Sequence, residues 1–253
     1  MLRRRNWQFV CAALALVVAS PASTEWFLDV YAGKGFMESA DVDIRPVDVP
    51  PSLGRIQADL QDVELDDFTS YGLRIGRWFE AVPGFGLAVD LFRFAPDVST
   101  QTVRGSATAD LHGTIDDIPI NIRAGVNGRV RLGNVDIPPT IAVSSLEVML
   151  RRPLLTSSAF PNGRLQPYIS AGPALLLTDI KPDVALGVKA GAGLVWRLSE
   201  RIALFGEYRF THFRPTIETG GVNVAGVETG DLEVELDANT QYVLGGLSFQ
   251  FGE

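Results

Sequence analysis

Several features that would indicate a soluble enzyme or a helical membrane protein are missing from this sequence of 253 residues. Its one cysteine, Cys11, lies early in an N-terminal apolar segment, too early for a lipidation site, so the remaining chain has no thiol for a disulfide. Beyond that segment, no apolar run approaches the ~20 residues that a transmembrane helix needs. Metal-ligand clusters, phosphate-binding glycine loops and dinucleotide motifs are absent. We therefore expect no metal ion and no cofactor.

The N-terminus has the composition of an export signal. Residues 3–5 are three arginines, residues 9–19 are apolar, and residues 20–22 are small enough for a signal peptidase. The apolar run is too short to serve as a membrane-spanning anchor, which is the alternative interpretation. We assign residues 1–22 to a cleaved signal peptide and residues 23–253 to a single domain.

The mature chain is acidic. Without the three arginines it keeps 19 basic residues against 30 acidic ones, a net charge of −11. Such a protein has no general attraction to nucleic acid or to an anionic lipid surface. We expect no nucleic-acid partner.

Eight segments of about ten residues alternate between apolar side chains and polar or small ones, with turn residues between them. They are residues 26–35, 69–79, 85–94, 141–152, 165–178, 186–197, 202–213 and 242–251. The last is apolar or small at every second position and ends in an aromatic residue shortly before Glu253, which is typical of the closing strand of a bacterial outer-membrane barrel. An even number of alternating strands predicts an all-β, eight-stranded, antiparallel up-and-down barrel.

The connections differ in length on the two sides of this barrel. Three are short or moderate, around residues 80–84, 161–163 and 199–200, and we assign them to the periplasmic side. On the other side, residues 36–68, 95–140 and 214–239 form long acidic loops, and only residues 179–183 are short.

The long loops also alternate weakly, as in residues 103–110, which predicts strands that continue above the bilayer as hairpins. A ten-stranded barrel would take two more membrane strands from residues 95–140. The arginines and aspartates of that segment make it too polar for a lipid-facing strand.

Four segments of the chain resemble a known family. The segments YGLRIGRWFEAVPGFGLAVDL, GRLQPYISAGPALLL, LGVKAGAGLVWRLSERIALFGEYRFTHF and YVLGGLSFQF are similar to the outer-membrane β-barrel superfamily that includes OmpA-type, OmpW-type and opacity-type proteins. The resemblance implies location in the outer membrane. It also implies contact with outer-membrane lipid and lipopolysaccharide, and recognition of the last strand by the barrel-assembly machinery. It covers the strands and short turns, and it does not indicate an activity.

The alternation also predicts a charged barrel interior. Six charged residues have the parity of inward positions near mid-strand: Arg74, Asp90, Glu147, Lys189, Glu207 and Arg209. An eight-stranded barrel is narrow enough for side chains to fill it, and charges there must pair. We interpret the six as a neutral salt-bridge network, the alternatives being an ion path or a catalytic carboxylate cluster.

Aromatic residues on the outward faces are expected to form girdles at the two membrane interfaces. On the periplasmic side these are Trp26, Trp196, Phe249 and Phe251, and on the other side Tyr71, Phe94, Tyr208 and Phe210.

Three functional hypotheses follow. The first is a non-enzymatic barrel with a structural or surface-contact role, whose surface partner is not identified. The second is a narrow channel for small apolar or ionic solutes. The third is a lipid-modifying enzyme, for which the only histidines are His112 and His212. Thr211, the hydroxyl next to His212, has the opposite strand parity, so we expect no catalytic residue.

Overall fold

The computed structural model describes residues 24–46, 54–82, 84–94, 99–115, 118–132, 142–177, 184–219, 223–224, 227–228 and 232–251. The assigned signal peptide, residues 1–22, lies outside these residues, so its cleavage stays a prediction. Within the described ranges, no helix has the length and apolarity to cross a membrane.

Eight antiparallel strands close into a barrel in the order β1-β16-β11-β10-β9-β8-β5-β4. Their bounds are β1 Thr24–Met37, β4 Phe68–Phe79, β5 Phe85–Arg93, β8 Ala142–Arg151, β9 Leu165–Leu177, β10 Val184–Arg197, β11 Ile202–Phe213 and β16 Ala238–Phe251. All eight predicted strands are confirmed, each with nearly the predicted bounds. The ten-stranded alternative is wrong, because the segment that would have supplied the extra strands lies outside the barrel.

The start of β1, the end of β16 and the short turns lie at one end of the barrel. β1 pairs with the closing strand β16 from Trp26 opposite Phe251 to Met37 opposite Thr240. In the first turn, Gly84 adopts a φ of +83°, and a Cβ there would lie 2.4 Å from the carbonyl oxygen of Arg151. Only glycine fits that conformation and that approach.

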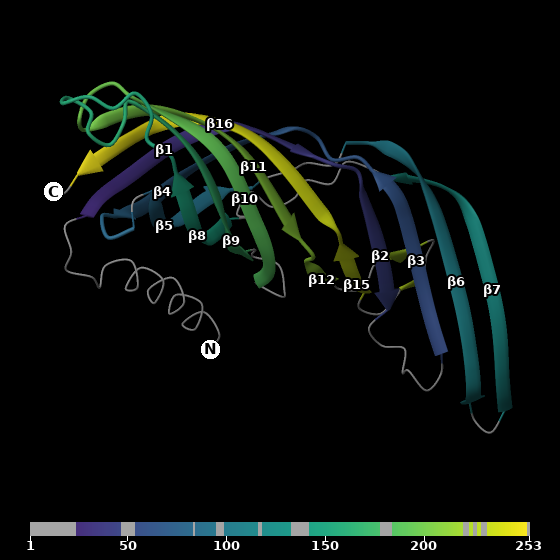
Figure 1. Ribbon diagram of the computed structural model, residues 1–253. Coiled ribbons are helices and arrows are strands. Elements are labelled where there is room, and N and C mark those ends of the chain that lie inside the picture. The colour runs from purple at the N-terminus through teal and green to yellow at the C-terminus, as the bar shows by residue number, and fades with distance from the viewer. Residues whose placement is uncertain are drawn as a thin grey trace.

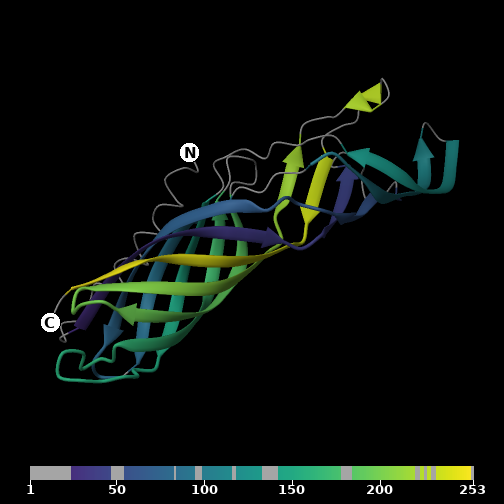
Figure 2. The same ribbon diagram turned by 90° about the horizontal axis from the view of Figure 1, so that it is seen from above.

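The long loops form a second sheet beyond the other end, which we call the outer sheet (Figure 1). Its order is β12-β15-β2-β3-β6-β7. The bounds are β2 Ala40–Pro46, β3 Gly54–Val63, β6 Gln101–Ile115, β7 Ile118–Leu132, β12 Thr216–Thr219 and β15 Leu232–Leu236, and a separate pair is β13 Asn223–Val224 and β14 Val227–Glu228. Figure 2 shows the outer sheet projecting from the barrel end opposite the C-terminus.

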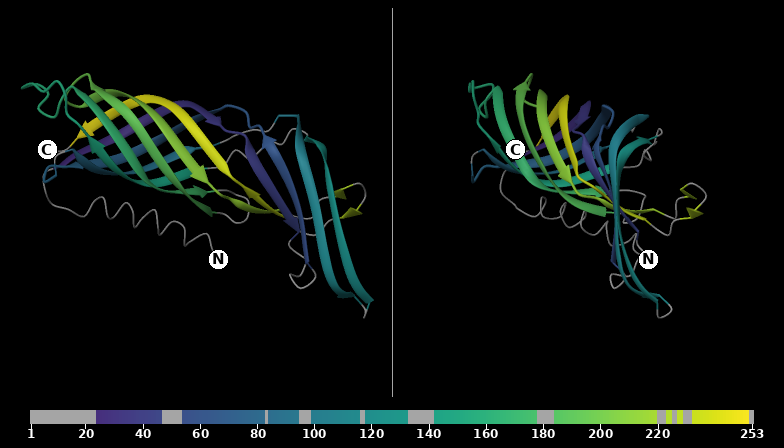
Figure 3. Two further views of the ribbon diagram at one scale, coloured as in Figure 1. Left: turned by 45° about the vertical axis from the view of Figure 1, so that its right-hand side comes forward. Right: turned by 90° about the vertical axis from the view of Figure 1, so that its right-hand side faces the viewer.

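The outer sheet continues six strands of the barrel. Its order matches the barrel order β11-β16-β1-β4-β5-β8, each outer strand following or preceding one of these along the chain. Strands β9 and β10 have no counterpart in the outer sheet as described. The sheet is therefore open on the side above β9 and β10, and both views in Figure 3 show it curving away beyond the barrel mouth.

Polarity inverts between the barrel and the outer sheet. On the barrel, apolar residues such as Leu73, Val188 and Leu194 are exposed on the outer wall, and charged residues are buried inside. Across β2, β3 and β6 of the outer sheet, one row of neighbours contains Ile44, Ala58 and Ala107, and the next row contains polar residues. An apolar row next to a polar row is the signature of a sheet with two different environments.

The apolar face of the outer sheet continues the inner face of the barrel. Ala40 and Val63, which begin this face on β2 and β3, are paired and buried. Asp237, between β15 and β16, contacts Arg214 at 3.2 Å on the outer side, while its neighbour Ala238 is buried. Near the barrel mouth, a β-bulge shifts the register in which β2 and β3 pair.

Candidate functional site

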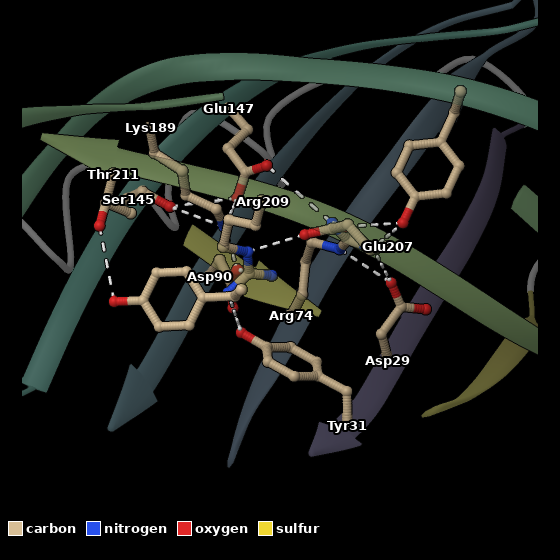
Figure 4. A network of polar contacts seen from close by, with 12 residues as sticks. Asp29, Tyr31, Arg74, Asp90, Ser145, Glu147, Lys189, Glu207, Arg209 and Thr211 are labelled. Atoms are coloured by element: carbon tan, nitrogen blue, oxygen red, sulfur yellow. Dashed lines mark hydrogen bonds and ion pairs between the residues drawn. The ribbon is translucent and has the colours of Figure 1, made fainter. Parts of the chain in front are cut away.

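The barrel lumen holds the densest group of charged side chains in the described structure. Arg74, Asp90, Glu147, Lys189, Glu207 and Arg209 are all at most 3% exposed. They come from β4, β5, β8, β10 and β11 and converge on one layer (Figure 4). The structure thus brings together the six residues that strand parity assigned to the interior.

One half of this layer is organised around Glu207. Its carboxylate accepts hydrogen bonds from Arg74 Nη1 at 2.5 Å, from Arg209 Nε at 2.7 Å and from the hydroxyl of Tyr168 at 2.6 Å. Arg74 also donates to Asp29 Oδ2 at 2.8 Å. Two guanidinium groups and a phenol compensate the desolvation of one buried carboxylate.

The other half is organised around Asp90. Its carboxylate pairs with Lys189 and, at 2.9 Å, with Arg209 Nη2, and accepts a hydrogen bond from the hydroxyl of Tyr31 at 2.5 Å. Lys189 also pairs with Glu147 at 2.5 Å. Arg209 therefore links the two halves into one network that crosses the barrel.

Three members of the network were not anticipated from the sequence: Asp29, Tyr31 and Tyr168. Both β1 residues lie between the outward positions of that strand, so the alternation carried the signal for them. With Asp29 the layer contains four carboxylates and three cations, not three of each.

A second cluster at the periplasmic rim restores the balance. Glu25 lies 2.5 Å from Arg151 and 3.3 Å from Arg197. Counting both clusters, five carboxylates face five cations. Charge neutrality holds for the described lumen as a whole, and the middle layer alone has an excess of one negative charge.

Apolar layers close the lumen above and below the charges. Phe27, Trp78, Ala88, Met149 and Tyr168 pack on the periplasmic side. On the other side lies a larger cluster that includes Phe68, Phe92, Phe94, Phe213 and Tyr242. The cavity beside Asp29 and Gln166 has a volume of only about 10 Å³, which is the space of a single water molecule. Among the residues that the structure describes, buried side chains therefore fill the lumen at the charged layer and on both sides of it.

Glycines in β10 make room for this packing. A Cβ on Gly193 would lie 2.5 Å from the ring of Tyr168, and one on Gly187 would lie 2.3 Å from the ring of Phe213. Both glycines face inward beside a large aromatic side chain. These glycines therefore leave space in the barrel wall for the aromatic side chains that fill the lumen.

Seven of the eight aromatic residues assigned to the girdles are at least partly exposed: Trp26, Tyr71, Trp196, Tyr208, Phe210, Phe249 and Phe251. Their contact with head groups stays a prediction. Phe94 is a correction: it is 4% exposed and packs edge-on against Phe68 inside the mouth. Arg77 was missed; it lies in register with Trp26 and is buried, with its guanidinium over the rings of Trp26 and Phe79 at 5.6 and 5.0 Å.

The side chains of His212 and the neighbouring Thr211 have different partners. His212 Nδ1 lies 2.8 Å from Asn239 Oδ1 and 3.4 Å from Asp237 Oδ1 at the barrel rim. Thr211 is buried in the lumen, with its hydroxyl 3.5 Å from that of Tyr242. His112 falls within β6, not in an irregular loop. No group of three or more candidate metal-binding side chains occurs among the residues that the structure describes.

No protein-family profile matches the chain, and no curated protein matches it. Among solved structures, it is similar to the outer membrane protein OprG from Pseudomonas aeruginosa, with a TM-score of 0.51 and 10% identity over 91% of this chain and 97% of that one. AlkL is matched at a TM-score of 0.42 and 15% identity over 93% of both chains. Neisserial surface protein A is matched at 0.33 and 10% identity over 85% of this chain and 95% of that one.

At these sequence identities the similarity shows the fold alone. Of the three matches, OprG is the one with a TM-score above 0.5. The match to OprG agrees with the closed eight-stranded barrel, and the outer wall of that barrel is apolar. In a closed barrel every strand is paired on both sides, so no unpaired strand edge faces lipid. The polar side chains of such a barrel lie inside it. The chain has the fold of the small outer-membrane β-barrels.

Proposed function

We propose that the protein is a non-enzymatic structural barrel that anchors the outer sheet at the cell surface. The filled lumen is the observation that supports this role most directly. Arg74 and Arg209 each pair with carboxylates from two strands, and aromatic layers lie on both sides of them. A selective pore would instead have a water-filled path lined by charges of one sign.

Planar-bilayer recording tests this proposal. The purified chain should give no steady single-channel conductance, because ions would have to displace the buried network. A steady conductance that falls when Glu207 or Lys189 is neutralised would contradict the proposal. Heat-modifiable migration on a gel should accompany each recording, to establish that the barrel is folded.

A second experiment separates the barrel from the outer sheet. In cells lacking the protein, envelope resistance to detergent should be restored by the full chain. A variant with residues 101–132 replaced by a short turn tests whether β6 and β7 contribute. Resistance that is the same with and without the protein would contradict a structural role.

One observation favours a second candidate, the uptake of small apolar solutes. The inner face of the outer sheet is apolar, and it leads to the open side above β9 and β10. A solute bound there would leave sideways into the bilayer, because the lumen below is filled. An apolar fluorescent probe should then bind the full chain, and Leu60→Asp should weaken that binding more than Gln61→Glu on the opposite face.

Both candidates leave the histidines without a catalytic role. Lipid analysis of cells that overproduce the protein tests the enzymatic hypothesis. A change in lipid A that His212→Ala abolishes would contradict the proposed function.

A further inference from the structure

Three arginines gather on the outer, polar face of the outer sheet. Arg104 on β6 lies directly opposite Arg129 on β7, and Arg131 is opposite Thr102 on the same face. All three arginines are exposed. Directly opposed residues of an antiparallel pair have Cβ atoms about 5 Å apart, and like charges at that separation destabilise the pair. We call these residues the arginine cluster.

The arginine cluster differs from three other arginines on this part of the molecule, each of which is paired with an aspartate. Arg45 lies 3.6 Å from Asp43, Arg123 lies 3.0 Å from Asp110, and Arg214 lies 3.2 Å from Asp237. Within the part of the chain that the structure describes, no acidic side chain forms an ion pair with Arg104, Arg129 or Arg131. Across the β3–β6 ladder, the neighbour of Arg104 is the neutral Gln61.

A hollow adjoins the arginine cluster. Its volume is about 270 Å³, and it is lined by Gln61, Arg104, Gly105, Ser106, Asn127 and Gly128. Gly105 and Gly128 are opposite each other and contribute backbone alone, whereas the four side chains all belong to the polar face. The nearest acid in register, Asp59, accepts hydrogen bonds from Gln57 at 2.7 Å and from Ser106 at 3.3 Å. The hollow therefore combines amide, hydroxyl and guanidinium donors.

The position of this hollow indicates what could fill it. The polar face of the outer sheet lies on the same side as the lipid-facing wall of the barrel. Gln61 precedes Tyr71, an exposed aromatic residue of that wall, by ten positions in the chain, which is at most about 34 Å of extended chain. The arginine cluster is thus above the acyl chains, at the height of the saccharides that cover an outer membrane.

We infer that the arginine cluster binds phosphate groups carried by the core saccharide of lipopolysaccharide. Guanidinium groups bind phosphate in bidentate geometry, and a phosphate between Arg104 and Arg129 would remove their mutual repulsion. The net charge of the chain gives no general attraction to such a ligand, so recognition depends on this local group of cations. The inference goes beyond the proposed structural role and does not depend on it.

Binding of labelled lipopolysaccharide to the full chain in detergent micelles tests the inference. The triple variant R104A/R129A/R131A is compared with R123A, which removes an arginine from the same face of β7 that is already paired with Asp110. The probes are a rough lipopolysaccharide that retains its core phosphates, the same preparation after chemical dephosphorylation, and inorganic phosphate as competitor. Heat-modifiable migration identifies variants whose barrel has folded.

The wild-type chain and R123A should bind the phosphorylated probe about tenfold more tightly than the dephosphorylated one, and the triple variant should lose this difference. Added salt should weaken the binding of the wild-type chain to the phosphorylated probe. Equal binding of both probes by the wild-type chain would overturn the inference, and so would an unchanged preference in a folded triple variant. Displacement of the labelled probe by micromolar inorganic phosphate would support the phosphate chemistry and overturn lipopolysaccharide as its source.

Discussion

The barrel and the outer sheet use the same alternation of side chains with opposite polarity. In the barrel, charged residues such as Glu207 face inward and apolar residues such as Leu194 face outward. In the outer sheet, Leu60 faces inward and Gln61 and Ser106 lie on the outer face. The strands continue from one region to the other, and what changes is the solvent outside the wall. The height at which the polarity inverts therefore marks the edge of the membrane.

The two regions also differ in how they are stabilised. In the lumen, Arg74 and Arg209 each contact at least two carboxylates and are fully buried, so the loss of one carboxylate leaves buried positive charge that is only partly compensated. In the outer sheet, the pair of Arg123 with Asp110 is exposed and contributes little. Substitutions of the same type should thus have unequal effects in the two regions.

The largest expected effect comes from breaking the lumen network. Glu207→Ala removes the carboxylate that Arg74 and Arg209 share, and it should lower the free energy of unfolding by about 3–5 kcal/mol. Urea unfolding of the refolded barrel, followed by tryptophan fluorescence, measures the loss. Asp110→Ala is the matched control and should change stability little. Similar losses in the two variants would show that the lumen charges are not the more strongly coupled set.

A smaller effect should follow from overpacking the same lumen without touching a charge. Gly193→Ala places a methyl group 2.5 Å from the ring of Tyr168, which donates a hydrogen bond to Glu207. We expect a loss of about 1–3 kcal/mol in the same unfolding experiment. Gly206→Ala, where the nearest atom is 3.9 Å away, is the control. A neutral result at Gly193 would mean that the ring moves without cost.

These two predictions also show what the sequence could and could not provide. The six charged lumen residues were identified because each lies between apolar neighbours on a strand that alternates without interruption. Asp29 lies in the same way between Leu28 and Val30 of β1, so the same alternation indicated that it faces inward. Tyr168 was harder to identify, because β9 alternates less regularly and contains Pro167 and Pro173.

The outer sheet was only partly predictable. Alternation in residues 103–110 indicated a hairpin above the bilayer, and β6 and β7 form one. The pairing of β3 with β6, and of β15 with β2, joins segments far apart in the sequence. Such pairings depend on where the barrel brings the strand ends together, and no local pattern in the loops encodes this. The arginine cluster became visible only once the register of β6 and β7 was known.

A third prediction concerns the junction of the two regions. Asp62, in the bulged part of β3, has a φ of 58°, a conformation that a β-branched residue strongly disfavours. Asp62→Val should destabilise the pairing of β2 with β3 by about 1–2 kcal/mol and leave the barrel intact. Hydrogen exchange at the amides of β3, compared with those of β11, measures this. Asp62→Gly should be tolerated, and equal protection of β3 in both variants would contradict the argument.

The smallest effect should be a pH dependence on the polar face of the outer sheet. A hydrogen bond to Asp59 raises the pKa of Asp43, and the pKa of Asp59 is lowered by its hydrogen bonds to Asp43 and Gln57. The contribution of Asp43 to stability is present at low pH and is lost as the pH rises through its raised pKa. That of Asp59 is lost as the pH falls through its lowered pKa.

Both contributions are present near pH 4, the ordinary pKa of aspartate, so the outer sheet should be most stable there and should lose a little stability on either side. NMR titration of the two carboxyl groups checks the directions of the shifts. Asp59→Asn should return the pKa of Asp43 toward its ordinary value. An ordinary pKa for Asp43 in the unaltered chain would show that the two carboxyl groups do not share a proton.

The inversion of polarity is tested most directly by spin labels placed on the outer faces of the two regions, with the protein in a lipid nanodisc. Labels at Val188 and Leu194 should be relaxed mainly by oxygen, which concentrates in the bilayer. Labels at Ser106 and Asn127 should be relaxed mainly by a water-soluble nickel complex. Equal access of the nickel complex to Leu194 and Asn127 would contradict the account.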